Sequence, residues 1–342
     1  MGSVKEVSIL VKPSDNSCGE GEFFFSDRYS VFDWGEMPDH IEGKGAALAT
    51  LSSYFFSLLE KEGMKTHFLG LFENGSFKKY EELSSPSDRM KVKVVRVVKP
   101  PYDETSGKYD YSSYAGVKNN YLIPLEVIYR NKLTEGSSVF KRVKNGSVTF
   151  KELGFDTDPK INETLASPVL DVSTKLEHTD RYILWDEAEK ISGLSPDNMK
   201  KVKEMILSIN TIITRECSKA GIENVDGKFE FGMDPEGNII VVDVLGTPDE
   251  CRFIYGGFHI SKEVARLWYR KTPWYPEAEE AKKTAGRDWK KAVKNPPPHL
   301  PPEMKELISH MYKAVTNEIT GKKFFNVPSL PEIIKAMKKY AE

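Results

Sequence analysis

Apolar and polar residues alternate along several short stretches near the start of the chain, and this period of two predicts β-strands. The runs VSILV (7–11) and EFFFS (22–26) are strand candidates, and KVKVVRVV (91–98) fits a half-exposed strand whose basic residues are solvated. Residues 45–63 are apolar at helical spacing and end at a glycine, which predicts a helix. Together these elements predict a small α+β lobe over residues 1–98.

Residues 99–120 interrupt this pattern, because they are rich in turn-forming residues and tyrosine. They predict a loop insertion and a hinge between two lobes. The larger second lobe is expected to span residues 121–342. Its expected elements are, in chain order, a strand at 123–130, a hairpin at 138–150 turning at Asn145-Gly146, a helix from Ser195-Pro196 to Gly221, a hairpin at 225–244 and, after Ile260, helices interrupted by the prolines 296–298.

The hairpin at 225–244 (VDGKFEFGMDPEGNIIVVDV) has the most informative polar side chains of the chain. Asp226, Lys228 and Glu230 alternate with apolar residues, so at strand period they share one face. The sequence DPEG (234–237) is a turn signal, and the residues after it predict the returning strand. Charged side chains on a mostly apolar hairpin are costly unless a ligand or a metal pairs them.

The register of the two strands decides which carboxylates meet. If Met233 pairs with Asn238, Lys228 lies opposite Asp243 and Glu230 lies diagonal to it. Diagonal neighbours are roughly 7–8 Å apart, close enough for two carboxylates to share one cation. Magnesium fits this pair better than calcium, because phosphate oxygens would complete its shell. A structural salt-bridge ladder is the alternative, and a one-residue slip would turn Asp243 away.

Two further segments suit phosphate groups. Lys5 follows a glycine at the start of a strand, where phosphate-contacting lysines often lie, although an ordinary surface lysine is the simpler explanation. Glu126 and Arg130 share one face of a predicted strand, and TEGSS (134–138) follows at once. An arginine fork beside a serine hydroxyl suits a phosphomonoester. A structural pairing of Glu126 with Arg130 and an ordinary turn is the alternative.

Two polar loops complete the candidate chemistry. STKLEHTD (173–180) concentrates charged residues, among them Lys175 and His178. With no second histidine nearby, His178 is better explained as a polar loop residue than as a base or ligand. GTPDECR follows the hairpin and places Asp249 and Arg252 at the end of a strand, where loops often hold binding residues. A Pro-Asp turn with a surface arginine is the alternative.

Composition excludes several classes of function. The 342 residues contain 49 Lys and Arg against 51 Asp and Glu, so the global charge gives no indication of a nucleic-acid partner. The three cysteines form no CxxC pair, which suits a reducing compartment and argues against a structural zinc site. We expect no secretory signal and no membrane span, and therefore a cytoplasmic protein. The sequence leaves a homo-oligomer open.

Taken together, the acid pair, the lysine near a glycine and the arginine–serine segment predict an enzyme that uses ATP and Mg²⁺. Its second substrate would be anionic and phosphorylated. A kinase-like phosphotransferase acting on a small phosphorylated polyanion needs the same magnesium pair. A nucleotide-binding regulatory protein without catalysis is a third hypothesis.

Six motifs in the same order resemble the phosphoribosylaminoimidazole-succinocarboxamide synthase (SAICAR synthetase) family over Gly2 to about Phe253. GSVKEV is similar to the family's GKxRxVY opening, and SVFDWGEMPDHIEGKGAAL resembles its S-x-F/Y-D and I-P-x-K-G stretch. PLEVIYRNKLTEGSSVFKR resembles P-x-E-x-x-x-R-N followed by G-S, and STKLEHTD resembles S-T-K-x-E with H-D. VDGKFEFG and VDVLGTPDECRF resemble D-x-K-x-E-F-G and D-E-x-x-T-P-D-x-x-R-F.

This resemblance implies a fold and a reaction. The expected fold is α+β with two lobes in a kinase-like arrangement, a small antiparallel-sheet ATP-binding lobe and a larger α/β lobe. The implied reaction belongs to de novo purine biosynthesis. ATP activates the carboxylate of carboxyaminoimidazole ribonucleotide as an acyl phosphate, and the amine of L-aspartate then attacks it.

The resemblance also implies roles for individual residues. Lys5 would contact the phosphates of ATP, and Glu230 and Asp243 would hold Mg²⁺. Lys228 and Lys175 would face the carboxylate being activated, as catalytic residues. The implied substrate-binding residues are Arg130, Ser137 and Arg252 for the 5′-phosphate, Glu126 and Asp226 for the ribose or imidazole, and Asp249 within the same pocket.

The chain departs from the family pattern at a few positions. Ser3 replaces the first basic residue of the opening motif, and Val244 replaces the acid that follows Asp243. The spacing from the arginine to the serine is one residue longer than usual, so Ser138 is an alternative to Ser137. These differences affect the expected contacts more than the expected reaction.

Overall fold

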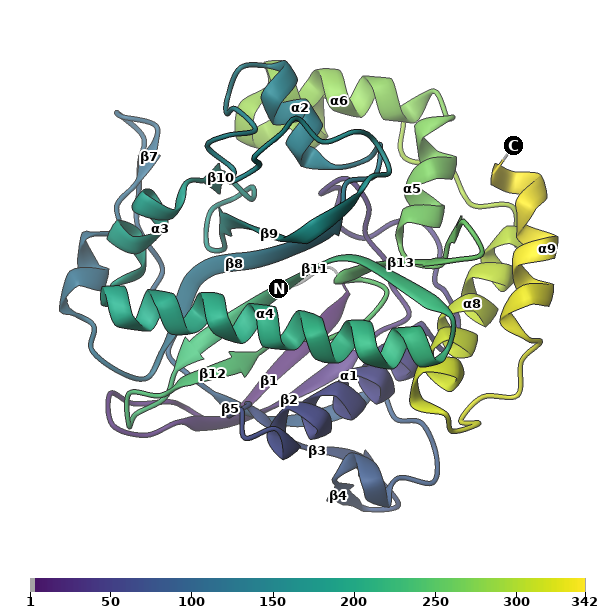
Figure 1. Cartoon of the computed structure of the whole chain (residues 1–342), viewed down its shortest axis with the longest axis horizontal. Helices are drawn as coiled ribbons and strands as arrows, with labels where there is room; N and C mark the ends of the chain where they lie inside the picture. Colours follow the sequence, from purple (N-terminus) through teal and green to yellow (C-terminus); the bar gives the residue numbers. More distant parts are fainter. Residues whose placement is uncertain (1–3, 342) are drawn as a thin grey trace.

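The computed structural model describes residues 4–341, so Ser3 and the first part of the GSVKEV motif lie outside the described residues. The N-terminal part forms a five-stranded antiparallel sheet in the order β1-β2-β5-β3-β4 (Figure 1). Its strands are β1 (Lys5–Val11), β2 (Gly19–Phe25), β3 (Phe68–Glu73), β4 (Ser76–Lys78) and β5 (Arg89–Val94). The strands predicted at 7–11 and 22–26 are confirmed in β1 and β2, and the strand predicted at 91–98 corresponds to β5, which already ends at Val94.

The helix predicted at 45–63 is α1 (Lys44–Lys61), and it packs against this sheet. Its inward residues are apolar, and Phe55, Phe56 and Leu59 are fully buried. The helix ends before Gly63, whose φ of 81° is the left-handed conformation that glycine adopts readily. Its sequence therefore determines both the buried face and the stop.

The second part of the chain is built on a seven-stranded sheet. Its order is β10-β9-β8-β11-β13-β14, and β12 also pairs with β11. All these pairs are antiparallel. The strands are β8 (Tyr121–Lys132), β9 (Thr164–Thr174), β10 (Tyr182–Ile183), β11 (Ile222–Met233), β12 (Ile239–Val242), β13 (Cys251–Tyr255) and β14 (Phe258–His259).

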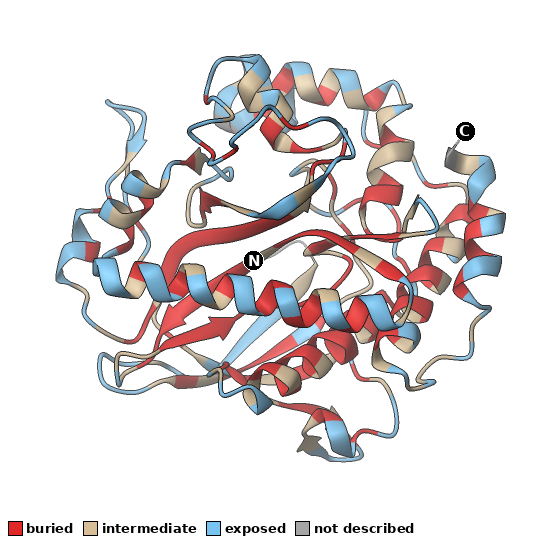
Figure 2. Cartoon of the chain, viewed as in Figure 1, coloured by how far each residue is buried: buried red, intermediate tan, exposed pale blue. Residues whose placement is uncertain are grey.

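The two faces of this sheet differ in chemistry. The long helix α4 (Pro196–Lys219) packs on β8 and β11 and buries apolar residues against them, as Figure 2 shows by its exposed outer side and the buried strands. Ser195 caps this helix by accepting a hydrogen bond from Asn198 N at 3.2 Å, as the Ser-Pro signal predicts. Side chains alternate along a strand, so the charged residues of β8 and β11 lie on the opposite face.

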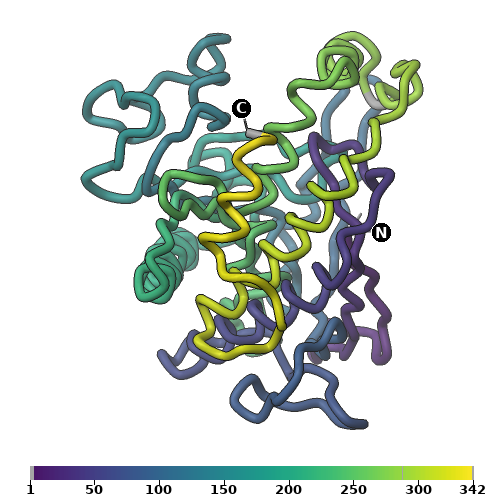
Figure 3. Tube along the Cα trace, turned by 90° about the vertical axis from the view of Figure 1, so that its right-hand side faces the viewer, coloured from purple at the N-terminus to yellow at the C-terminus, as the bar shows by residue number. Residues whose placement is uncertain are grey.

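Helices fill the rest of the chain after Ile260, as predicted. They are α5 (Glu263–Arg270), α6 (Trp274–Thr284), α7 (Trp289–Ala292), α8 (Pro302–Thr320) and α9 (Leu330–Ala341). Earlier in the chain, the short helix α3 (Trp185–Ser192) packs on β8 and β9. The helix α8 packs along α1, so the yellow and dark blue segments lie together in Figure 3. Thr316 Oγ1 donates to Ala47 O at 3.1 Å, and Ser309 Oγ donates to Glu42 O at 2.6 Å.

The hairpin predicted at 138–150 is wrong, because the segment begins with a helix, α2 (Ser138–Lys144). Ser137 caps this helix by accepting a hydrogen bond from Val139 N at 3.3 Å. Val139, Phe140 and Val143 then pack into one small apolar cluster. Their spacing along the chain is that of one helix face and not the alternation of a strand. Asn145-Gly146 ends the helix instead of turning a hairpin.

The predicted insertion at 99–120 contains local structure. A two-stranded hairpin, β6 (Tyr102–Asp103) and β7 (Lys108–Tyr109), precedes a short 3₁₀ helix (Ser112–Gly116). Tyr111 and Tyr114 are buried there. The division into lobes at 1–98, 99–120 and 121–342 stays a prediction, since one continuous apolar core includes residues from both sides of the insertion.

Within the part of the chain that the structure describes, no helix is both long enough and apolar enough to span a bilayer.

Candidate active site

The predicted hairpin is confirmed, but its predicted register is wrong by one residue. Met233 pairs with Ile239 rather than with Asn238, and Glu230 therefore pairs with Val242. The cause is the turn, where Asp234 Oδ1 accepts a hydrogen bond from Asn238 N at 2.7 Å. This contact uses Asn238 to close the turn, so the first paired residue of the returning strand is the next one.

A left-handed residue compensates for this slip. Asp243 follows the end of β12 and has a φ of 69°, a conformation that only Asn, Asp and Gly adopt with any frequency. Its carboxylate forms an ion pair with Lys5, which enters from the edge strand β1. The carboxylate is also close enough to Glu230 for its charge to help raise the pKa of that residue. Both carboxylates therefore face one site.

Lysines and acids alternate across the polar face of the large sheet. Glu126 on β8 accepts hydrogen bonds from Lys228 Nζ on β11 at 2.7 Å and from Lys175 Nζ, just after β9, at 3.1 Å. Lys175 Nζ also lies 2.7 Å from Glu230. Burial opposes ionisation of Glu126, but the two lysines outweigh it and lower its pKa to about 2. Glu126 is thus a fixed negative charge that holds both lysines in place.

The acid pair of the hairpin has unequal members. Burial, followed by the negative charge of Asp243, raises the pKa of Glu230 to about 7. Burial also opposes ionisation of Asp243, but Lys5 and Lys175 lower its pKa well below the usual range. Two neighbouring carboxylates that repel each other are stabilised by a shared divalent cation.

Glu230 and Asp243 can supply only part of the coordination shell of Mg²⁺. Among residues 4–341, no group of three or more His, Cys, Asp or Glu is arranged to hold a metal ion alone. Mg²⁺ is commonly bound by one or two carboxylates together with substrate phosphates and water. Glu230 and Asp243 are therefore a suitable donor pair for Mg²⁺ that arrives with a nucleotide.

A second charged group continues along the same face. Arg130 on β8 is almost fully buried and lies 2.8 Å from Asp171 and 3.5 Å from Asp226. Asp226 also accepts a hydrogen bond from Arg252 Nη1 at 3.1 Å. Arg130 Nη2 donates to Ser138 Oγ at 3.1 Å. The arginine thus contacts Ser138, whereas the Ser137 hydroxyl caps α2.

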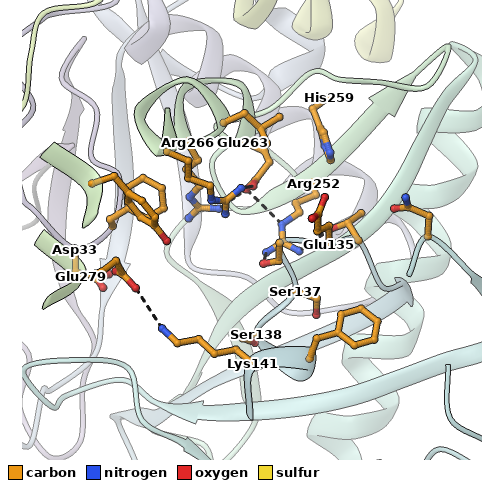
Figure 4. A pocket seen from close by; sticks show the side chains of 18 of the residues that line it. Asp33, Glu135, Ser137, Ser138, Lys141, Arg252, His259, Glu263, Arg266 and Glu279 are labelled. Atoms are coloured by element: carbon orange, nitrogen blue, oxygen red, sulfur yellow. Dashed lines mark hydrogen bonds and ion pairs between the residues drawn. The ribbon is translucent and has the colours of Figure 1, made fainter. Parts of the chain in front are cut away.

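A cavity of about 680 Å³ lies beside this group (Figure 4). It is lined by the TEGSS loop and by three arginines, Arg252, Arg266 and Arg270, which surround Glu263. Figure 4 shows Arg252 and Glu263 joined across the cavity wall. The three guanidinium groups share the Glu263 carboxylate, and Arg252 also pairs with Asp226, so N–H groups beyond those in these ion pairs suit a bound phosphate.

A smaller cavity of about 190 Å³ joins the arginines to the lysines. It shares Arg252, Glu263 and Arg266 with the larger cavity and reaches Lys228 and Asp180. A molecule with a phosphate among the arginines could therefore extend toward the lysine side chains. This continuity brings together two groups of residues that the sequence places far apart.

Asp249 also lines the smaller cavity, but its carboxylate contacts other protein side chains. It lies 2.7 Å from Lys44 Nζ and accepts a hydrogen bond from Tyr312 Oη at 2.6 Å. Burial opposes its ionisation, but Lys44 and neighbouring groups lower its pKa to about 2. The Lys44–Asp249–Tyr312 contact connects α1, the loop after β12 and α8. The predicted place of Asp249 in the substrate pocket stays a prediction, since its carboxylate is fully engaged by these two partners.

We expect Asp249→Asn to lower the free energy of unfolding at pH 7 by about 3 kcal/mol, because it leaves the Lys44 ammonium buried without a counter-charge. A carboxyl group whose pKa is depressed from 3.8 to about 2 stabilises the fold above pH 4 and loses this contribution as the pH falls toward 2. The difference between wild type and variant should therefore shrink as the pH falls from 4 toward 2. Urea unfolding at several pH values measures this difference in stability.

The control variant is Asp158→Asn, at an exposed position, which should change stability by less than about 0.5 kcal/mol. Equal losses in the two variants would contradict the assignment.

Several residues of the arginine cavity were not predicted from the sequence. Glu263, Arg266 and Arg270 lie three and four residues apart on α5, so they share one helix face. That spacing was the available signal. Asp171, which binds Arg130, gave no such signal because it is a single acid between Leu170 and Val172. Val244, at the position where the resemblance implies an acid, belongs to the apolar core.

The chain is similar to known proteins in sequence and in fold. The sequence profile of the family described as SAICAR synthetase matches residues 15–281. The chain belongs to the SAICAR synthetase family. An Archaeoglobus fulgidus protein described as a putative phosphoribosylaminoimidazole-succinocarboxamide synthase is 46% identical over 342 residues, which cover 100% of both chains. A Thermoplasma acidophilum phosphoribosylaminoimidazole-succinocarboxamide synthase is 34% identical over 88% of this chain and 93% of its own.

A solved structure is similar as well. A SAICAR synthetase in complex with ADP has a TM-score of 0.60 and 25% identity, covering 94% of this chain and 97% of that chain. The predicted family and the fold of helices with antiparallel sheets are confirmed. The chain is an ATP-dependent carbon–nitrogen ligase of purine biosynthesis, and the phosphotransferase alternative is not favoured.

Proposed function

We propose that this SAICAR synthetase positions its three substrates along the polar face of the large sheet. The observation that supports the proposal is the continuous series of charged groups from Lys5 and Asp243, through the lysines around Glu126, to the arginine cavity. The substrates are ATP, carboxyaminoimidazole ribonucleotide and L-aspartate. A cytoplasmic location, the absence of nucleic-acid partners and a homo-oligomeric state stay predictions from the sequence.

The nucleotide is expected between β1 and the hairpin. Val95, Ile240 and Val242 form a small buried apolar cluster at this place. Val7 and Ile9 are on the same face of β1 as Lys5, and both are exposed. Exposed apolar side chains beside a lysine and two carboxylates suit a base at one end and phosphates at the other. Lys5, Glu230 and Asp243 are therefore assigned to the ATP phosphates and Mg²⁺, which neutralises phosphate charge when bound.

The phosphorylated substrate is expected in the joined cavities. Its 5′-phosphate is assigned to Arg252 and to Ser137 or Ser138, with Arg266 and Arg270 nearby. Arg130 is already paired with two carboxylates, so we assign it to positioning Asp226 and Ser138 as well as to the substrate. In this placement Glu126 and Asp226 are near the ribose or the imidazole.

The carboxylate to be activated then lies at Lys228 and Lys175. Their ammonium groups would hold its oxygens against the γ-phosphate of ATP. A carboxylate oxygen attacks the phosphorus and ADP leaves, which gives an acyl phosphate. The amine of aspartate attacks the acyl carbon, phosphate leaves, and a proton is lost from the nitrogen. The residues supply position and charge rather than a covalent intermediate.

Release of ADP tests this function. With ATP, Mg²⁺ and carboxyaminoimidazole ribonucleotide, sustained ADP release should require L-aspartate, and one amide product should form for each ADP. A coupled assay with aspartate omitted is the control. A phosphorylated product that accumulates without aspartate would support the phosphotransferase instead, and no turnover under any condition would support the regulatory alternative.

We expect Arg252→Ala to raise the KM for carboxyaminoimidazole ribonucleotide by about 10- to 100-fold, the value of a charge-assisted hydrogen bond to phosphate. The KM for ATP should change by less than about threefold, because the nucleotide site lies at the other end of the face. Steady-state kinetics with each substrate varied in turn measures both. Arg215→Ala, on the outer side of α4, is the matched control and should change neither. Equal losses for both substrates would contradict this division.

A further inference from the structure

The backbone on both sides of the metal-binding aspartate is held by side chains of the small sheet and its helix. His67, just before β3, places Nε2 3.1 Å from Asp243 O. Because a carbonyl oxygen only accepts hydrogen bonds, Nε2 is the donor in this contact. On the other side, Ser52 Oγ of α1 accepts a hydrogen bond from Leu245 N at 2.9 Å. Asp243 therefore lies between two fixed points.

The ring of His67 has no room to move. It is 2% exposed and packs between the rings of Phe23 and Phe56, with centroids 5.6 and 5.2 Å away. Its own backbone is tied to β12, since His67 N donates to Val241 O at 3.0 Å and Val241 N donates to Lys65 O at 3.0 Å. The donor that contacts Asp243 is thus rigid and belongs to a different sheet from Glu230.

This contact matters because Asp243 has an unfavourable backbone conformation. At φ 69° Asp is less strained than most L-residues but less stable than in an extended or helical conformation, so the surrounding structure must stabilise it. Without that left-handed turn the register of β12 would direct the Asp243 carboxylate away from Glu230. Whatever stabilises the turn therefore keeps the two carboxylates together.

We infer that His67 is a positioning residue of the ligase, which acts through the Asp243 carbonyl to hold the Asp243 carboxylate in place for Mg²⁺. It touches neither substrate nor metal. This inference rests on the proposed role of Glu230 and Asp243. His67, which directly precedes β3, is not among the polar residues that the sequence marks as candidates for the site.

Mn²⁺ binding to the enzyme–ADP complex tests the inference without turnover. His67→Phe keeps an aromatic ring between Phe23 and Phe56 but removes the donor, and it should raise the Kd for Mn²⁺, measured by electron paramagnetic resonance, about 10- to 100-fold. His67→Gln places an N–H near the position of Nε2 and should stay within about threefold of wild type. If His67→Phe does not fold, His67→Leu provides the same loss of donor.

Phe56→Leu is the matched control, because it disturbs the same aromatic cluster and Phe56 lies on α1 without a hydrogen bond to Asp243. It should lower the melting temperature and leave the Kd for Mn²⁺ within about threefold. The inference would be overturned if His67→Phe bound Mn²⁺ with the Kd of wild type, or if Phe56→Leu raised the Kd for Mn²⁺ as much as His67→Phe does.

The Asp243→Asn variant separates this inference from the proposed function. If Asp243→Asn binds Mn²⁺ in the ADP complex as tightly as wild type does, the metal assignment itself is wrong and the inference falls with it. If Asp243→Asn loses Mn²⁺ while the donor-less His67 variant keeps it, the metal assignment stands and the inference about His67 alone is wrong.

Discussion

Asp243→Asn is expected to lower kcat by at least about 10³-fold while the fold stays intact, since removing a single group that stabilises transition-state charge already costs 10²- to 10³-fold. Asparagine tolerates the left-handed conformation that this position requires, so the backbone need not change. The variant loses the negative charge that faces Lys5 and that we propose binds Mg²⁺ together with Glu230. Steady-state kinetics measures the loss, and circular dichroism with a thermal melt verifies the fold.

Glu223→Gln is the matched control for this variant. Glu223 lies on the same strand as Glu230 and pairs with Lys132 at 2.9 Å, far from the hairpin turn. Removing its charge should change kcat by less than about twofold. Turnover near the wild-type value in Asp243→Asn would show that the nucleotide phosphates are held elsewhere.

Lys228→Met is the second variant with a large expected effect, a decrease in kcat of about 10³-fold. Methionine keeps most of the apolar stem, and Glu126 keeps Lys175 as its partner, so the fold should survive with a modest loss of stability. What disappears is the ammonium group proposed to hold the reacting carboxylate. The KM for ATP should stay within about threefold of wild type.

The control for this variant is Lys132→Met, which removes a lysine from β8 that pairs with Glu223. It should leave kcat unchanged, because the residue lies at the far end of the strand. A decrease confined to the KM for ATP in Lys228→Met would instead place Lys228 at the nucleotide. Rapid-quench measurement of the first turnover shows whether phosphoryl transfer itself is slowed.

The polar face of the large sheet could be predicted from the sequence because it depends on alternation alone. Asp226, Lys228 and Glu230 lie on one face in any strand, whatever its neighbours are. The register could not be predicted in the same way. It depends on Asp234 and Asn238 closing the turn, and on a left-handed residue after β12, and neither is visible in a pattern of apolar residues.

Contacts between distant segments could not be predicted from the sequence either. Lys5 and Asp243 are 238 residues apart, and only the pairing of β1 at the sheet edge brings the lysine to the hairpin. The arginines of α5 could be grouped by helical spacing, but nothing in that spacing shows that the TEGSS loop lies opposite them. The helix at 138–144 was missed because its few apolar residues also fit a short strand.

The packing of α8 on α1 has a consequence for the order in which the protein folds during synthesis. Thr316 binds Ala47 across 269 residues of sequence, and Tyr312 reaches Asp249 beside Lys44. Chains are made from the N-terminus at about 5–20 residues per second, and early segments fold as they emerge. For many seconds after the first sheet and α1 have been synthesised, the face of α1 that later packs against α8 therefore stays exposed. We expect this waiting period to be the stage at which the nascent chain depends most on chaperones.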